Sequence, residues 1–313
     1  ISASSTENDS YAISTTRYQG LFGVIGGKGK VSNIYIENPQ IKKGQYVGGI
    51  AGLNYGKINN CYVVATNTTS TIETNNIGYK VGAVQEDRVY IGGIAGYSEG
   101  TIANCQVQGL LIQQSNALAD KTTLSMGGIV GANTNLIENC VVKGTEGGSN
   151  LITTNKGGTQ YIGGIAGENS STIKSSYASK GIRDFNGKPS EDIFTLKAST
   201  GNQTSFIGGI VGLSDNNSIL KYSFADVIVE GTNVGGISSL SYGEIAECYS
   251  AGDLTGSKVG GLVYKVEYGT VSNCYVTGML NGINKNSVKA GMAVDITLIN
   301  KDEKSASVRN SFS

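Results

Sequence analysis

Cysteine thiols are the most chemically capable side chains in this sequence of 313 residues, which contains five of them and no histidine. They are Cys61, Cys105, Cys140, Cys248 and Cys274. A thiolate can act as a nucleophile beside an imidazole base, or as a ligand of zinc or iron when cysteines cluster in CxxC pairs. Neither arrangement occurs here. Because all five occupy one position of a repeat, the sequence instead predicts an inward row of reduced thiols that behave as small hydrophobic groups.

Single carboxylates form the second group with catalytic potential. They are Glu99, Glu168, Asp215, Glu244 and Glu267. Enzymes that cleave acidic polysaccharides use such groups to bind calcium or as an acid/base pair. Here they stand alone, offset by one or two positions, and no DxDxDG, GGxGxD or GxxxxGK(S/T) pattern provides a calcium or phosphate loop. We interpret them as solvated turn charges and expect no catalytic residue, no metal and no cofactor.

Tyrosines recur at the position that follows the cysteine of the repeat. They are Tyr35, Tyr62, Tyr177, Tyr249 and Tyr275. Successive side chains of a strand point to opposite faces, so these rings should point outward where the thiols point inward. The resulting strip is a candidate binding platform for sugar rings or a protein partner, and its alternative role is stacking between strands. Gln106, Val141 and Ser223 interrupt the strip in this alignment.

These residues are positioned by a repeat that runs through the chain. The string GGI or GGL occurs seven times, each time after an apolar residue. Its first glycines are Gly48, Gly92, Gly127, Gly163, Gly208, Gly235 and Gly260. A second string, such as INNCYV at 58–63, follows so that the cysteine position lies 13 residues after the first glycine in five copies and 14 in two. Copies are 25 to 45 residues apart, and the shortest spacing defines the structural unit.

Each unit contains only short apolar segments rich in Ile, Val and Tyr, which predicts strands rather than helices. One unit cannot bury its apolar face, so neighbouring copies must stack as a solenoid. Opposite parity of Ile58 and Cys61 predicts a corner at Asn60, where asparagine tolerates left-handed backbone and can bond to the next coil. A second corner is expected at the paired glycines, through positive φ or close backbone approach. The predicted fold is all-β, a parallel β-helix of about nine irregular coils that forms one domain over 1–313.

Four insertions lengthen the unit on one side of the predicted solenoid. They are 64–90, 107–125, 142–161 and 178–206. All of them emerge between the same two strands of the repeat, so they should protrude from one side, which is commonly the recognition side. Alternating stretches at 78–85 and 192–199 predict extra strands or hairpins. The insertions could instead cover sheet edges against aggregation.

The pattern GGIAGxNxGxIxNCYV, carried by residues 48–63, resembles the GLUG motif, a repeat of secreted and surface proteins of bacteria. Those proteins include adhesin-like proteins and the regions that flank the peptidase of immunoglobulin-A-specific zinc metallopeptidases. The resemblance extends from Gly20 to Phe312 outside the insertions. It implies an architectural repeat in an extracellular protein, whereas the HExxH zinc motif of the peptidases is absent from this sequence.

Charge and hydropathy narrow the function classes further. Lys and Arg total 24 and Asp and Glu total 24, so no net field favours nucleic acid. No apolar run approaches the roughly 20 residues that span a bilayer, so we expect no membrane insertion. With no signal peptide or initiator Met at Ile1, the chain is expected to be a segment of a longer protein.

The leading hypothesis is a non-enzymatic structural or adhesive module of a bacterial cell-surface or secreted protein. Its partner would be a host or bacterial surface protein or a glycan. One alternative is an accessory, non-catalytic solenoid of a large secreted zinc metallopeptidase. The other is a β-helix enzyme that acts on polysaccharides.

Overall fold

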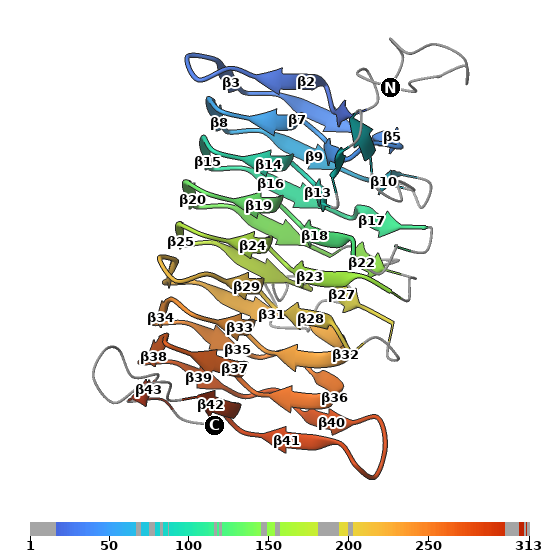
Figure 1. The fold of residues 1–313 in the computed structure, drawn as a ribbon. Coiled ribbons are helices and arrows are strands. Elements are labelled where there is room, and N and C mark those ends of the chain that lie inside the picture. Colours follow the sequence, from blue (N-terminus) through green and yellow to red (C-terminus); the bar gives the residue numbers. More distant parts are fainter. Residues whose placement is uncertain are drawn as a thin grey trace.

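The protein winds into a parallel β-helix of nine stacked coils, seen in a computed structural model (Figure 1). The structure describes residues 17–66, 70–74, 79–81, 84–86, 88–115, 118, 121–144, 149–153, 157–180, 194–199, 203–297, 307–309 and 311. Over these residues the chain forms no helix, and so none that is long and apolar enough to span a membrane. The predicted fold class is confirmed.

Four parallel sheets, A to D, run along the stack, and sheets B, C and D take one strand from each coil that they cross. Sheet B comprises β2 (Phe22–Ile25), β7 (Ala51–Asn54), β14 (Ala95–Ser98), β19 (Val130–Asn133), β24 (Ala166–Asn169), β29 (Val211–Ser214), β33 (Ser238–Ser241), β37 (Val263–Glu267) and β42 (Ala293–Thr297). Sheet C comprises β3 (Lys30–Ser32), β8 (Lys57–Asn59), β15 (Thr101–Ala103), β20 (Leu136–Glu138), β25 (Thr172–Lys174), β30 (Ile219–Lys221), β34 (Glu244–Ala246), β38 (Thr270–Ser272) and β43 (Ser307–Arg309). Sheet D comprises β4 (Tyr35–Glu37), β9 (Tyr62–Val64), β16 (Gln106–Gln108), β21 (Val141–Lys143), β26 (Tyr177–Ser179), β31 (Phe224–Asp226), β35 (Tyr249–Ser250) and β39 (Tyr275–Val276).

Sheet A is wider, because most coils contribute two strands to it. The strands that precede the glycine corner are β1 (Tyr18–Gln19), β6 (Tyr46–Gly48), β13 (Arg88–Gly92), β18 (Thr123–Gly127), β23 (Thr159–Gly163), β28 (Ser205–Gly208) and β41 (Val288–Ala290). The strands that follow sheet D are β5 (Gln40–Lys42), β10 (Thr71–Thr74), β17 (Leu111–Gln114), β22 (Ser149–Thr153), β27 (Phe194–Lys197) and β40 (Leu280–Gly282). In two coils both halves form a single strand, β32 (Ile228–Gly235) or β36 (Leu254–Gly260).

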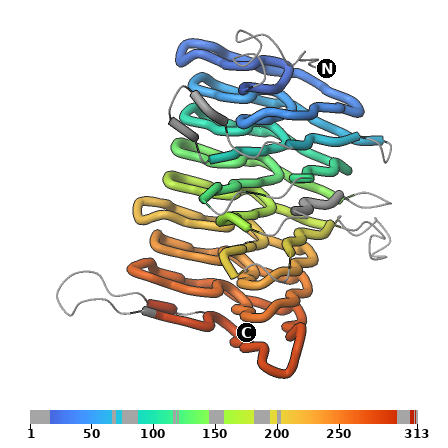
Figure 2. Tube along the Cα trace, turned by 45° about the vertical axis from the view of Figure 1, so that its right-hand side comes forward, coloured from blue at the N-terminus to red at the C-terminus, as the bar shows by residue number. Residues whose placement is uncertain are grey.

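The described parts of the predicted insertions follow a strand of sheet D and precede the next strand of sheet B in the chain. Each of the four ranges contains one strand of the solenoid itself, namely β10, β17, β22 or β27. The expected hairpin at 78–85 is present as the antiparallel pair β11 (Tyr79–Val81) and β12 (Val84–Glu86). The stretch at 192–199 forms β27, which pairs in parallel with β22 and β32 rather than in a hairpin. Figure 2 shows the stacked coils as a continuous tube from the N-terminus to the C-terminus.

The asparagine corner between sheets C and D is confirmed. Asn33, Asn60, Asn104, Asn139 and Asn273 all have φ between 53° and 57°. The Asn60 amide donates to Asn33 Oδ1 at 2.6 Å, and the Asn139 amide donates to Asn104 Oδ1 at 3.2 Å. Asn310, which occupies the equivalent position in the last copy of the repeat, lies outside the described residues.

The glycine corner between sheets A and B depends on close approach and not on positive φ. A Cβ on Gly48 would lie 2.5 Å from the Cα of Ala95 in the next coil, and one on Gly49 would lie 3.0 Å from a methyl group of Val63. Neither glycine is among the described residues with positive φ. The paired glycines therefore remove side chains where two backbones and the core meet.

The interior is filled by rows of aliphatic side chains, in which equivalent residues of successive coils stack on one another. One such row is formed by the central residues of the seven inner strands of sheet C: Ile58, Ile102, Ile137, Ile173, Leu220, Ile245 and Val271. Each of these side chains is at most 1 % exposed. Full burial of such a side chain contributes about 1.5–3 kcal/mol, so stacking between coils stabilises what one coil alone cannot.

Candidate functional site

The predicted tyrosine strip lies on the outer face of sheet D. Tyr177, Phe224, Tyr249 and Tyr275 stack face to face at centroid distances of 4.6, 4.8 and 4.9 Å, with interplanar angles of 2–7°. Burial raises the pKa of Tyr249. Rings packed in this way present their edges to solvent and their faces to each other, which favours a stacking role.

Two strip residues lie apart from this stack, nearer the N-terminus. The rings of Tyr35 and Tyr62 are 6.3 Å apart and tilted by 31°, and Tyr35 is 60 % exposed. The Tyr62 hydroxyl donates to Asn60 Oδ1 at 3.0 Å. Strand register leaves Gln106 and Val141 between the two groups, as expected from the sequence.

The interruption assigned to Ser223 is wrong. Strand register pairs Phe224 with Tyr177 on one side and with Tyr249 on the other, so Phe224 continues the strip. Ser223 is 2 % exposed and occupies the cysteine position instead. The reason is a longer turn in this coil, which places the cysteine position 15 residues after Gly208.

The cysteine position is an inward hydrogen-bonding row. All five cysteines are free and at most 1 % exposed, which confirms their inward orientation. Cys140 Sγ donates to the carbonyl of Glu138 at 3.3 Å, and Ser176 Oγ donates to that of Lys174 at 2.9 Å. Ser176 Oγ also accepts the backbone N–H of Cys140 at 3.1 Å. Serine and cysteine therefore substitute for each other here because both donate, a role beyond that of a small hydrophobic group.

We expect the native thiols to be unreactive. The neighbouring Cys140 thiol and burial raise the pKa of Cys105 to about 12, so its reactive thiolate is scarce near pH 8. Ellman titration at pH 8 should label less than one thiol per chain rapidly in the native protein and five after denaturation. Rapid labelling of several native thiols would contradict the buried row.

The raised pKa of the Cys105 thiol also makes the stability of the fold depend on pH. An unfolded thiol loses its proton near pH 9, whereas folded Cys105 keeps it to about pH 12. The free energy of unfolding should therefore be unaffected by this group below pH 9 and fall between pH 9 and 12.

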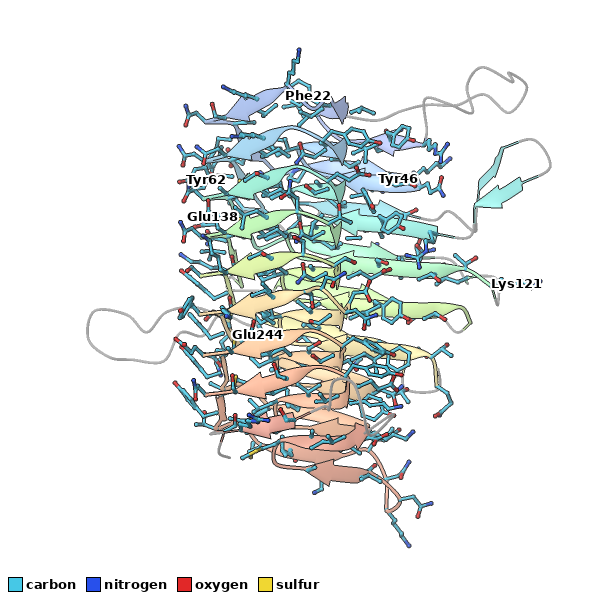
Figure 3. The ribbon with its side chains drawn as sticks, turned by 60° about the vertical axis from the view of Figure 1, so that its left-hand side comes forward. Phe22, Tyr46, Tyr62, Lys121, Glu138 and Glu244 are labelled. Carbon is cyan, nitrogen blue, oxygen red and sulfur yellow. The ribbon has the colours of Figure 1, made fainter. Side chains whose placement is uncertain are left out.

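Sheets A and B meet in a re-entrant corner, where their outward side chains converge. Figure 3 shows Tyr46, on sheet A, on the opposite side of the solenoid from Tyr62. The Tyr97 ring of sheet B lies 6.2 Å from the ring of Tyr46 and 5.1 Å from that of Tyr90. A Cβ on Gly96 would lie 2.6 Å from the backbone nitrogen of Val47, so the two strands are in contact.

A charged network crosses three coils at this corner. Arg88 forms an ion pair with Glu168 at 3.1 Å and donates to the Tyr90 hydroxyl at 3.3 Å, and Ser125 donates to Glu168. Burial is the main cause that raises the pKa of Tyr90 to about 12. The Glu168 side chain is only 12 % exposed and lies in β24, so its assignment as a solvated turn charge is wrong.

The other carboxylates divide into two groups. Glu99 and Asp215 are exposed in turns, as expected. Glu244 and Glu267 lie in β34 and β37 and pair with Lys221 and Lys265. Within the described ranges no three His, Cys, Asp or Glu side chains gather in a way that could hold a metal ion.

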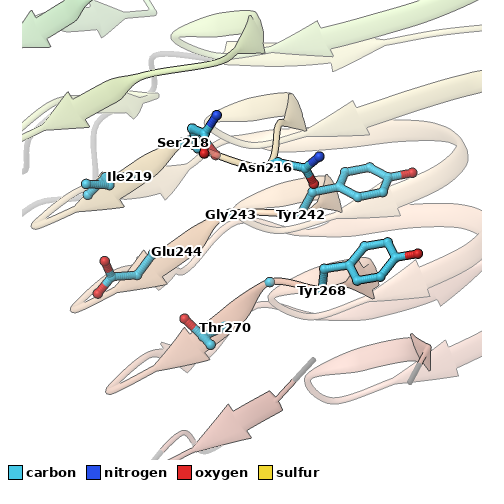
Figure 4. Close-up of a pocket in the computed structure, with 10 residues that line it drawn as sticks. Asn216, Ser218, Ile219, Tyr242, Gly243, Glu244, Tyr268 and Thr270 are labelled. Carbon is cyan, nitrogen blue, oxygen red and sulfur yellow. The ribbon is translucent and has the colours of Figure 1, made fainter. Parts of the chain in front are cut away.

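A depression of about 1020 Å³ lies at the edge between sheets B and C (Figure 4). It is lined by Asn216, Asn217, Ser218, Ile219, Tyr242, Gly243, Glu244, Tyr268, Gly269 and Thr270. The rings of Tyr242 and Tyr268 lie side by side with centroids 6.4 Å apart. Apart from Glu244, none of these residues was singled out from the sequence, although the available signal was a tyrosine before glycine in two consecutive repeats.

Comparison with known proteins gives no match: no family model, no curated protein and no solved structure is similar to this chain.

Proposed function

We propose that this chain is a non-enzymatic structural and adhesive module of a bacterial cell-surface or secreted protein. The observation that carries the proposal is the in-register stacking of nine coils. At about 4.8 Å per coil the stack is a rod of roughly 40 Å in which outward residues recur at strand spacing. A rigid surface loses little conformational entropy when it binds a partner.

The expected partner is a host or bacterial surface protein or a glycan. Equal numbers of acidic and basic residues give the rod no net charge, so electrostatic attraction to nucleic acid is not supported. Its outward aromatic, amide and hydroxyl side chains suit polar neutral surfaces. The GLUG-like repeat supports the bacterial, extracellular setting.

Binding of the purified chain to arrays of glycans and extracellular-matrix proteins tests this function. We expect saturable binding to at least one surface that heat-denatured protein does not show. In parallel, incubation with pectin-like polymers and calcium should yield no unsaturated, ultraviolet-absorbing products. Binding to nothing would contradict adhesion, and product formation would contradict a non-enzymatic role.

A further inference from the structure

The depression between sheets B and C results from unequal turn lengths in three successive coils. The turn from β29 to β30 has four residues, 215–218, whereas the next two turns, 242–243 and 268–269, have two each. The longer turn forms a wall, closed by the hydrogen bond from Ser218 N to Asp215 O at 2.9 Å. Gly243 lies against this wall and has no side chain to fill the space. A Cβ there would lie 2.7 Å from the carbonyl oxygen of Asp215.

Tyr242 and Tyr268 give the depression an aromatic pair. Their centroid distance of 6.4 Å exceeds the 4.6–4.9 Å of the sheet D stack, so these rings cover each other less. Tyr242 is fixed in place: burial and a hydrogen bond to Glu267 raise its pKa to about 12, and Glu267 is in turn paired with Lys265. A ring held by such contacts is preorganised for a ligand.

Tyr268 is held in a strained conformation. Its φ is 59°, and the N–H of Gly269 bonds to the carbonyl of Glu267 at 2.7 Å, which closes a γ-turn around it. A bulky residue in this left-handed turn costs of order 1–3 kcal/mol. Glycine or asparagine would adopt the same turn at lower cost, so stability alone does not account for tyrosine here.

Ser218 provides the second, independent observation. The residue is 2 % exposed and lines the depression, yet its Oγ has no hydrogen-bond partner. An unpaired buried hydroxyl costs about 1–3 kcal/mol, a cost that a ligand hydroxyl could remove. Asn216 and Asn217 add exposed amides on the wall.

We propose that this depression binds a neutral sugar unit of a glycan chain, with its apolar ring face against Tyr268 and its hydroxyls on Ser218 and the Asn216 amide. The assignment rests on the adhesive function proposed above. The only charged lining residue is the acidic Glu244, which pairs with Lys221 at 2.9 Å. With no cation of its own, the lining disfavours uronic acids, sialic acids and phosphates. The volume lies at the upper end of the roughly 300–1,000 Å³ typical of small-molecule sites.

Calorimetric titration with neutral hexaoses of glucose, xylose and mannose tests the site, with hexagalacturonate as the anionic counterpart. We expect at least one neutral oligosaccharide to bind. Tyr268→Asn keeps the left-handed turn and removes the ring, and should raise Kd at least tenfold without lowering the denaturation midpoint. Ser218→Ala should raise Kd several-fold in a protein at least as stable as the parent. Tyr222→Asn is the matched control and should leave Kd unchanged, because it removes an exposed ring at another position of positive φ, 53°, outside the lining of this depression.

The outcomes separate this site from the broader function. A chain that binds a surface protein but none of the four probes, or that prefers hexagalacturonate, overturns the neutral-sugar site and leaves adhesion standing. The site is also overturned if Tyr222→Asn abolishes sugar binding while Tyr268→Asn does not. A folded chain that binds no array and no probe overturns both proposals.

Discussion

Replacing Gly127 with alanine should destabilise the protein by roughly 3 kcal/mol or more, or prevent it from folding. The added Cβ would lie 2.6 Å from the carbonyl oxygen of Ile165 and 2.7 Å from the Cα of Ala166, and closer still to the carbonyl oxygen of Val130. All three are backbone atoms of the corner or of the next coil, and no rotamer change can move them. Because each coil packs on both neighbours, the strain in a central coil weakens the whole stack. Urea denaturation followed by far-ultraviolet circular dichroism measures the loss.

Gly26→Ala is the matched control, because a Cβ there would have no atom within 4 Å. This substitution should leave the denaturation midpoint unchanged or raise it slightly, since alanine restricts the unfolded chain. Equal midpoints for the two variants would contradict the view that the paired glycines serve close approach.

The sequence predicts the glycine corner but not its physical cause. The spacing of the glycine pairs and the parity change between Val47 and Ile50 predict a corner. They do not distinguish positive φ from close backbone approach as the reason for glycine. Which cause applies depends on the neighbouring coil, since a Cβ added to Gly48 would lie 2.5 Å from the Cα of Ala95 in that coil. Local sequence carries no such information about a contact between coils.

The candidate sites could be predicted only where the same repeat position occupies the same place in every coil. The outward tyrosines and inward cysteines follow from strand alternation, because register between coils is regular there. Phe224 was missed because two extra turn residues shift its coil relative to Gly208. The same two residues build the wall over Tyr242, so one irregularity both hid part of the strip and created the depression.

The networks that cross coils were equally invisible in the sequence. Arg88 and Glu168 are 80 residues apart and meet only because their strands belong to coils two steps apart in the stack. The carboxylate was assigned to solvent because it stands alone in the sequence, with no calcium or phosphate motif beside it. Long-range pairing in a solenoid depends on register, which short patterns do not encode.

Asn133→Leu should destabilise the protein by roughly 3 kcal/mol, although leucine is similar in size and more apolar. Asn133 is 1 % exposed at the end of β19. Its amide donates to the carbonyl of Asn135 at 2.9 Å and to Asn169 Oδ1 at 2.8 Å, and its Oδ1 accepts the N–H of Asn135 at 3.2 Å. Leucine would remove all three hydrogen bonds, and the Asn135 carbonyl and Asn169 Oδ1 would keep only the N–H groups of Thr172 and Ser171. At about 1 kcal/mol for each lost hydrogen bond, the loss exceeds the gain from apolar burial.

Asn133→Ser separates hydrogen bonding from packing. Strand register places Ser98 beside Asn133 in the preceding coil, and Ser214 and Ser241 hold the same position further along. The Ser98 hydroxyl donates to the carbonyl of Gly100 at 3.0 Å, so serine can meet the turn in the same way. We expect this variant to lose about 1 kcal/mol, mainly from the smaller side chain. If the leucine variant proved as stable as the serine variant in urea denaturation, the result would contradict this prediction. Apolar packing, and not the hydrogen bonds of residue 133, would then stabilise the turn.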